Sequence, residues 1–163
     1  MRIAPTLAAA AVLALTSFGV GSAQAPAPDV KMFATGPEVQ AMIANARAKY
    51  EPKSAASFSQ TIVKAAPYDV TLDYRTHAGA SSLHQMQAEL IFVVEGKMTF
   101  VTGGTMIDPK NTNADNFSGT GVKGGVARQM AKGDWVMVPQ NTPHWISATD
   151  GELILIALHM PRG

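Results

Sequence analysis

Two histidines and one glutamate are spaced in a way that suits a metal site. Four residues separate His84 from Glu89, and His144 follows later in the chain, shortly after Pro139. Imidazole nitrogens and carboxylate oxygens are good ligands for Fe(II), Mn(II), Zn(II), Ni(II) and Cu(II). The chain has no cysteine, so thiol chemistry is excluded and any metal must be held by histidine, aspartate or glutamate. Such a site requires the three side chains to converge from different strands.

The sequence around these residues predicts strands. Apolar and polar residues alternate strictly from Tyr68 to Arg75, which is the period of a half-buried strand. Residues 90–94 and 97–102 predict a hairpin around Glu95-Gly96. Further strands are expected at 58–63, 127–130, 133–138, 144–148 and 153–160. Short strands separated by Gly and Pro indicate an all-β sandwich or barrel.

A helix and a long polar segment accompany these strands. Thr35-Gly36-Pro37-Glu38 has the spacing of a capping box with proline in the first turn. Pro52 ends the helix, because the residue before proline avoids helical backbone. Residues 103–125 are rich in Gly, Asn, Asp and Thr and predict a loop inserted between strands. The role of this loop stays open, and a lid over the barrel mouth is one interpretation.

The first 25 residues predict a signal peptide. A short positive start is followed by an uncharged apolar run and then by small residues at 21–25. Cleavage after Ala25 uses the better A-x-A pattern but leaves Pro26 first, so cleavage after Ala23 is the alternative. An uncleaved anchor is less favoured, because breaks interrupt the run at Pro5, Thr6, Ser17 and Gly19. We expect a periplasmic or secreted protein with no membrane contact after cleavage.

Charge and length limit the partners and the number of domains. Thirteen basic residues stand against twelve acidic ones, and no basic run appears, so nucleic acid is not an expected partner. A mature chain of about 140 residues suits one domain with one core. We expect a leader and helix over 26–57 and a single β domain over 58–163.

The segments that carry the three candidate ligands resemble the two motifs of the cupin superfamily. The first motif, roughly G-x5-H-x-H-x(3–4)-E-x6-G, corresponds to the segment from Gly79 to Gly96. The second, roughly G-x5-P-x-G-x2-H-x3-N, corresponds to the segment from Gly133 to Ala148. The resemblance covers residues 70 to 160, approximately. It implies a single jelly-roll β-barrel with an internal metal site at His84, Glu89 and His144.

This chain departs from the family pattern in three ways. Alignment on Glu89 and Gly96 makes His84 the second histidine of H-x-H, so Ser82 stands where the first is expected. The leading glycine is also displaced, and the later Gly and Asn are replaced by Asn141 and Ala148. Two histidines and one glutamate form the ligand set of the facial triad of non-haem Fe(II) oxygenases, which leaves positions open for substrate or water.

Residues close to the motifs are candidates for the remaining roles. Strand parity places Ile146 on the same face as His144, and the expected apolar lining is Met86, Phe92, Met137 and Ile146. Candidates for a proton-transfer group, chosen by position, are Tyr74, Ser82 and His77. His77 is also the alternative fourth ligand. His159 follows an apolar run, where a lone histidine is more often structural or exposed than a ligand.

The resemblance implies several reactions, because cupins of this size include dioxygenases, isomerases and lyases. We expect a periplasmic enzyme that acts on a small organic molecule with one divalent ion (Fe, Mn or Zn) as Lewis acid. One alternative is a non-catalytic cupin that captures a small ligand or a metal. Another is a cupin without metal that keeps these residues as a polar floor. A third alternative is a purely structural barrel that associates through its sheet face. Proteins of the family that the chain resembles are often dimeric, and the candidate interface residues of such a homodimer are Phe58, Tyr68, Val70 and Leu72.

Overall fold

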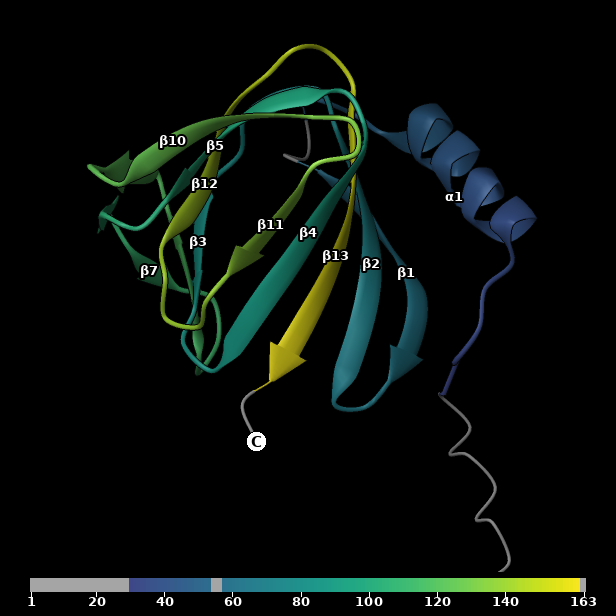
Figure 1. Cartoon of the computed structure of the whole chain (residues 1–163), viewed down its shortest axis with the longest axis horizontal. Coiled ribbons are helices and arrows are strands. Elements are labelled where there is room, and N and C mark those ends of the chain that lie inside the picture. Colours follow the sequence, from purple (N-terminus) through teal and green to yellow (C-terminus); the bar gives the residue numbers. More distant parts are fainter. Residues whose placement is uncertain (1–29, 54–56, 162–163) are drawn as a thin grey trace, which may run out of the picture.

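The computed structural model describes residues 30–53 and 57–161. The predicted signal peptide, residues 1–25, lies outside these residues. Within them the chain forms one helix, α1 (Gly36–Lys49), and thirteen strands (Figure 1). The strands are β1 (Phe58–Ala65), β2 (Tyr68–Arg75), β3 (Ser81–His84), β4 (Gln87–Glu95), β5 (Lys97–Thr102), β6 (Thr105–Ile107), β7 (Lys110–Asn111), β8 (Asn116–Gly119), β9 (Gly121–Lys123), β10 (Val126–Ala131), β11 (Trp135–Val138), β12 (His144–Thr149) and β13 (Leu153–Pro161).

Two antiparallel sheets make up the body of the protein. One has the strand order β1-β2-β13-β4-β11 and the other has the order β10-β5-β12-β3-β8-β7, while β6 and β9 form a separate pair. Neighbours in these sheets are mostly distant in the sequence, as in a jelly roll. The predicted all-β class and jelly roll are confirmed. Among the described residues the strands pair as open sheets and do not close into one continuous barrel ladder.

The main core lies between the two sheets. β4 buries Glu89, Ile91 and Val93 on one face, the alternation expected of a strand with one inward side. Phe100 and Met98 of β5 meet these residues from the opposite sheet and are almost fully buried. The inward face of β4 therefore carries both core packing and the candidate ligand Glu89.

The helix packs on the outward face of the five-stranded sheet, at the side of β1 and β2 (Figure 1). Its predicted capping box is present, because the Thr35 hydroxyl accepts from the Glu38 backbone and the Glu38 carboxylate accepts from the Thr35 backbone. Ile43 and Ala46 are buried against outward residues of the sheet, which include Leu72, Tyr74 and Ile154. No helix of the described residues is long and apolar enough to cross a membrane.

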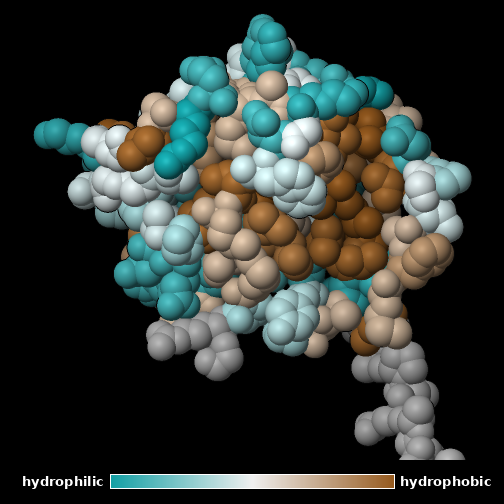
Figure 2. Space-filling view, viewed as in Figure 1, coloured by the Kyte–Doolittle hydropathy of each residue, from teal (hydrophilic) through white to brown (hydrophobic). Residues whose placement is uncertain are grey.

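The part of this outward face that α1 leaves open is largely hydrophobic, as the brown surface in Figure 2 shows. Trp135 and Met137 of β11 are both more than half exposed there. The Trp135 ring stacks on Phe92, with ring centroids 4.3 Å apart. Leu72, which we expected at a dimer interface, is instead fully buried in the cluster under α1. Homodimer formation stays a prediction.

The segment 103–125, predicted as a loop, is folded into four short strands, β6 to β9. β8 pairs with β3, which places Asn116 opposite His84. A Cβ at Gly119 would lie 2.6 Å from the carbonyl oxygen of Ile107 and 2.8 Å from Oγ of Ser81, so glycine allows this close approach. The strands are short and mostly polar, so they lack the apolar alternation by which strands are predicted. The loop prediction was wrong for this reason.

Candidate metal centre

Glu89 is the residue around which the candidate metal centre is arranged. It is the third residue of β4, faces inward and is only 8% exposed. His159, its cross-strand neighbour, lies on β13 of the same sheet. His84 ends β3 and His144 begins β12, both in the other sheet. Four side chains from the two sheets therefore meet at one carboxylate.

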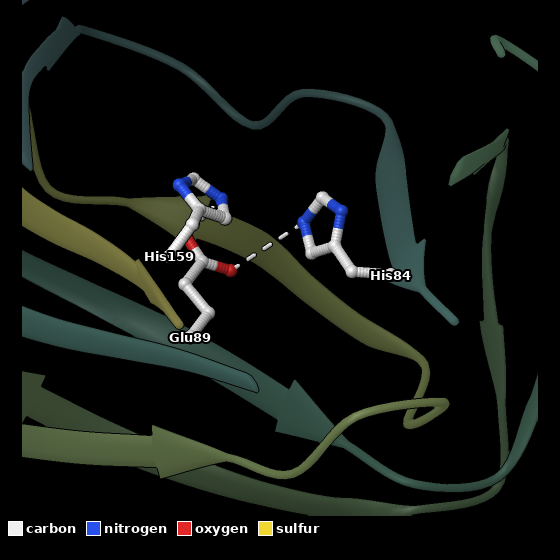
Figure 3. Close-up of side chains that lie close together, drawn as sticks. All are labelled: His84, Glu89 and His159. Atoms are coloured by element: carbon white, nitrogen blue, oxygen red, sulfur yellow. Dashed lines mark ion pairs between the residues drawn. The ribbon is translucent and has the colours of Figure 1, made fainter. Parts of the chain in front are cut away.

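The distances show that each histidine directs its Nε2 atom toward this carboxylate. Nε2 of His144 lies 3.0 Å from Oε2 of Glu89, and Nε2 of His84 lies 3.7 Å from the same oxygen. Nε2 of His159 lies 3.6 Å from Oε1 (Figure 3). One ligand atom each of His84, Glu89 and His159 lie within 4.8 Å of one another, and His144 is not part of that group although it makes the shortest contact with Glu89. These residues are able to hold a metal ion.

On the other side of each imidazole ring, Nδ1 faces an oxygen. Nδ1 of His84 lies 2.7 Å from Oδ1 of Asn116, and Nδ1 of His144 lies 3.0 Å from the backbone carbonyl oxygen of Thr142. Nδ1 of His159 lies 3.9 Å from a carboxylate oxygen of Asp69. Metal-binding histidines have such partners, which fix the tautomer and the orientation of the ring.

The partners of His84 and His144 determine which ring nitrogen carries a lone pair. The Asn116 amide donates through Nδ2 to Oδ1 of Asn113 over 2.9 Å, so Oδ1 is the atom that faces His84. A carbonyl oxygen only accepts, so Nδ1 of both rings must donate. In a neutral ring Nε2 then presents its lone pair toward Glu89, an arrangement that a bound cation would satisfy.

Glu89 shows a second feature that a bound cation would satisfy. Its Oε2 atom is buried and has no hydrogen-bond partner among the residues that the structure describes, although His144 is close. A buried unpaired carboxylate oxygen is costly. One divalent ion would satisfy this oxygen and the imidazole lone pairs together, and the mixed nitrogen and oxygen donors suit Fe(II), Mn(II) or Zn(II). The residues present therefore fit a metal ion.

The surroundings favour the protonation states that a metal requires. Burial raises the pKa of Glu89, but the contact with His144 and the attraction of all three histidines outweigh burial, so the net pKa is lowered. Burial lowers the pKa of His84, and this effect exceeds the opposing influence of Asn116 and Glu89. An ionised Glu89 and a neutral His84 are the metal-binding forms of these side chains.

A cavity of about 350 Å³ adjoins the cluster, and all four of its residues line it. The apolar part of the wall comes from Ile91, Phe100, Trp145, Ile146, Leu155 and Ala157. The polar part comes from Ser57, Ser59, Thr71, Asp73, Arg75 and Ser82. This volume lies in the lower range of small-molecule sites, which run from about 300 to 1,000 Å³.

The structure separates the three residues considered for proton transfer. Ser82 lines the cavity and is the cross-strand neighbour of His144. Tyr74 is buried on the opposite side of its sheet, in the cluster under α1. His77 contacts the Tyr50 hydroxyl through Nδ1 at 2.9 Å and does not line the cavity. Only Ser82 has the placement that proton transfer in this cavity needs, and its role stays a prediction.

Of the four residues expected to line the cavity, one does so and three do not. Ile146 lines the cavity on the same strand face as His144, as parity predicts. Phe92 and Met137 face outward, because β4 turns Glu89 inward and Val138, which pairs with Glu89, turns inward on β11. Met86 lies between β3 and β4 and is 47% exposed. The expected lining was thus wrong for Phe92, Met137 and Met86.

His159 and Asn116 are the site residues that sequence reasoning missed. His159 comes after both motifs, and only its register with Glu89 brings it to the cluster. Asn116 lies in the segment that was predicted as a loop. Nε2 of His159 lies 3.6 Å from Oε1 of Glu89, which brings His159 into the group that could hold a metal ion.

Comparison with known proteins gives a fold and no closer relative. No protein-family model matches the chain, and no curated protein matches it. A proposed mannose-6-phosphate isomerase of Ralstonia eutropha JMP134 has a TM-score of 0.50 at 18% identity, over 71% of this chain and 94% of that one. The protein BH2720 of Bacillus halodurans has a TM-score of 0.52 at 14% identity, over 82% of this chain and 83% of that one.

A cupin-superfamily protein of Desulfitobacterium hafniense DCB-2 is also similar, with a TM-score of 0.48 at 13% identity, over 69% of this chain and 84% of that one. The likenesses with a TM-score of 0.50 and 0.52 show that the chain shares its fold with those two proteins. Identity this low carries no information about the reaction, so the function must be argued from the site.

Proposed function

We propose that this chain is a metal-dependent enzyme with a cupin fold that acts on a small organic molecule. One divalent ion (Fe, Mn or Zn) is held by Glu89 together with His84, His144 and His159. The observation that carries the proposal is the common orientation of the three imidazoles. Each Nε2 faces the buried Glu89 carboxylate, and each Nδ1 faces an oxygen.

The placement of the cluster favours catalysis over storage. A divalent ion held at this position would supply Lewis-acid chemistry toward an oxygen of the substrate. All four cluster residues line the cavity, so a small molecule has direct access to them. A structural or storage site is closed by its protein ligands, whereas a catalytic site keeps room for an exchangeable one.

The chain's own residues bind and orient the substrate. Ile91, Phe100 and Leu155 form an apolar wall that excludes water from one side of the cavity. The Ser82 hydroxyl, on the strand that pairs with β12, is placed to donate or accept a proton at a substrate bound next to His144. The sequence of residues 1–25 supports export to the periplasm as the setting of this activity.

Metal content tests this proposal directly. The protein is purified without chelator from the exported fraction, and its metals are measured by elemental analysis. We expect about one equivalent of a transition metal in the wild type, and its loss in four variants: His84→Ala, Glu89→Ala, His144→Ala and His159→Ala. His77→Gln is the matched control, since His77 contacts Tyr50 away from the cavity. Its metal content should stay at the wild-type level.

The identity of the metal then directs the search for the reaction. Iron calls for oxygen-dependent assays, and zinc or manganese for lyase and isomerase assays. A wild-type protein that binds no transition metal even after reconstitution would remove the metalloenzyme proposal. A loaded protein that binds small molecules without converting any of them would identify the non-catalytic alternative.

A further inference from the structure

A second polar feature lies in the cavity, away from the metal cluster. Arg75 and Asp73 point into it from β2, and the Arg75 side chain is only 12% exposed. Nη2 of Arg75 donates to Oδ2 of Asp73 over 3.0 Å. The Ser59 hydroxyl of β1 donates to the other oxygen of Asp73. Asp73 thus accepts one hydrogen bond from Ser59 and one from Arg75, and the second of these fixes the guanidinium.

One buried donor of this guanidinium has no hydrogen-bond partner in the part of the chain that the structure describes. Nε of Arg75 is buried and has no hydrogen-bond partner among the residues that the structure describes. Arginine does not lose its proton in proteins, so this donor is always present. A buried donor without an acceptor costs roughly 1–3 kcal/mol, so the protein leaves this guanidinium incompletely satisfied. Nε itself is closed off, and a bound molecule would meet the guanidinium through the 12% of the side chain that stays accessible at the cavity wall.

With the divalent ion of the proposed function in place, the charges in the cavity favour an anion as that molecule. Apart from the histidines, the ionisable side chains that line it are Asp73, Glu89 and Arg75, two carboxylates and one guanidinium. The divalent ion of the proposed function turns this balance into one net positive charge. A single carboxylate group neutralises it, and the planar guanidinium matches the geometry of a carboxylate.

The strand register gives the separation of the two features. Along β13, His159 is at the cluster and Leu155 pairs with Asp73, so the two levels are four residue steps apart. At about 3.3 Å per residue this corresponds to roughly 13 Å along the strand. Arg75 bends back toward Asp73 and so toward the cluster. A ligand that reaches both features is elongated.

We propose that Arg75 anchors the substrate of this cavity by pairing with a carboxylate group, while an oxygen function at the other end of the same molecule faces the metal cluster. The inference rests on the proposed function, since the metal supplies the second attachment. It identifies the substrate class as elongated organic acids. The competing interpretation is that Arg75 only fixes Asp73 and the β1–β2 hairpin.

Dicarboxylates of increasing length are suitable probes. Succinate, adipate and suberate are titrated into metal-loaded protein, with the neutral adipamide as reference. Binding is measured by calorimetry and by the fluorescence of Trp145, which lines the cavity. We expect at least one dicarboxylate to bind ten times more tightly than adipamide, or better, with the longer acids preferred. Metal content is measured before each titration.

Three variants separate the anchor from a structural role. Arg75→Gln should weaken dicarboxylate binding at least tenfold and leave adipamide binding and metal content unchanged. Arg75→Lys keeps the charge without the planar donors and should lose less. Arg128→Gln is the matched control, because Arg128 is exposed on β10, away from the cavity, and donates to Thr102 and to the backbone carbonyl of Val126. It should bind like the wild type.

Several results would overturn the anchor. The first is an equal affinity of Arg75→Gln and the wild type for dicarboxylates. The second is that no dicarboxylate binds to the metal-loaded wild type. The third is that an alkyl phosphate binds more tightly than the dicarboxylates and that its binding depends on Arg75. Should Arg75→Gln fail to fold, Arg75→Lys and the adipate–adipamide comparison decide alone. Arg75-dependent binding to a protein that cannot be loaded with metal would keep the anchor and remove the proposed function.

Discussion

The two faces of the five-stranded sheet have different roles, although the same strands form both. The inward face of β2, β13 and β4 carries Asp73, Arg75, His159 and Glu89 around a cavity. The outward face of the same strands is apolar, and part of it is buried under α1. Neighbours in the sequence, such as Leu158 and His159, therefore serve packing and chemistry separately. Period-two alternation makes this division.

The difference teaches that stability and ligand binding should respond to different substitutions. Burial of apolar surface under α1 stabilises the fold, and this stabilisation depends little on how the buried side chains are oriented. The inward cluster places ionisable groups away from water, which costs free energy unless each has a partner. Substitutions of the apolar residues under α1 should change the free energy of unfolding, and substitutions in the inward cluster of ionisable residues should change affinity.

The largest expected effect is on the outward face. Leu72 is fully buried beneath α1, and Leu72→Ala should lower the free energy of unfolding by about 2–5 kcal/mol through lost burial and a cavity. Urea denaturation measures this change. Met137→Ala, exposed on the same face, is the control and should stay within about 0.5 kcal/mol of the wild type. Loss of metal from folded Leu72→Ala protein would contradict the division between the faces.

Two adjacent residues of β13 give the sharpest comparison of the faces. His159→Ala should lower metal affinity more than about 100-fold, because even indirect partners of metal ligands are worth 10–100-fold. Leu158→Ala, on the outward side of the same strand, should keep wild-type affinity. Competition with a chelator of known affinity measures both. Equal affinities in the two variants would show that His159 is not a ligand.

A smaller effect is expected in the opposite sheet, where Asn116 faces Nδ1 of His84 at 2.7 Å. Asn116→Ala removes the acceptor that orients this ring, and metal affinity should fall by about 10–100-fold. Asn111→Ala on the exposed strand β7 is the matched control. The same chelator competition applies. An unchanged affinity in Asn116→Ala would mean that the ring is oriented by other contacts.

The sequence alone was sufficient for the parts of the site that lie within motifs or regular patterns. The motif spacing led to His84, Glu89 and His144, and the capping box and the alternation led to α1 and most strands. His159 was missed because residues 153–158 are apolar on both sides. This strand is packed on both faces near its start, so alternation does not reveal where His159 points. Only the register with Glu89 does.

The wrong lining residues have a different origin. Once Glu89 is taken to face inward, parity alone turns Phe92 outward, so this error was avoidable. The strands of 103–125 were not predictable in that way, since they are held largely by backbone pairing and by close approach at Gly119, and few of their apolar side chains, such as Val122, are buried. Asn116 therefore needed the structure to be found.

The smallest expected effect concerns the ion pair that joins α1 to the sheet. Arg47 donates to both carboxylate oxygens of Glu152, at 2.9 and 2.6 Å. Both side chains are partly exposed, so Arg47→Met should lower the free energy of unfolding by only about 0.2–1 kcal/mol at pH 7. The hydrogen bond from Arg47 lowers the pKa of Glu152 below its ordinary value, despite the opposing effect of burial.

The pH dependence of this small effect follows from the direction of that shift. A carboxyl group whose pKa is lower in the folded state stabilises the fold above its unfolded pKa, and the contribution is lost as pH falls through the folded pKa. The difference between wild type and Arg47→Met should therefore be constant near neutral pH and disappear as acid protonates Glu152. Urea denaturation at a series of pH values measures it, with Glu152→Gln expected to behave like Arg47→Met. A difference that persists in acid would indicate that Arg47 stabilises α1 by packing, and the outward face would then depend on burial alone.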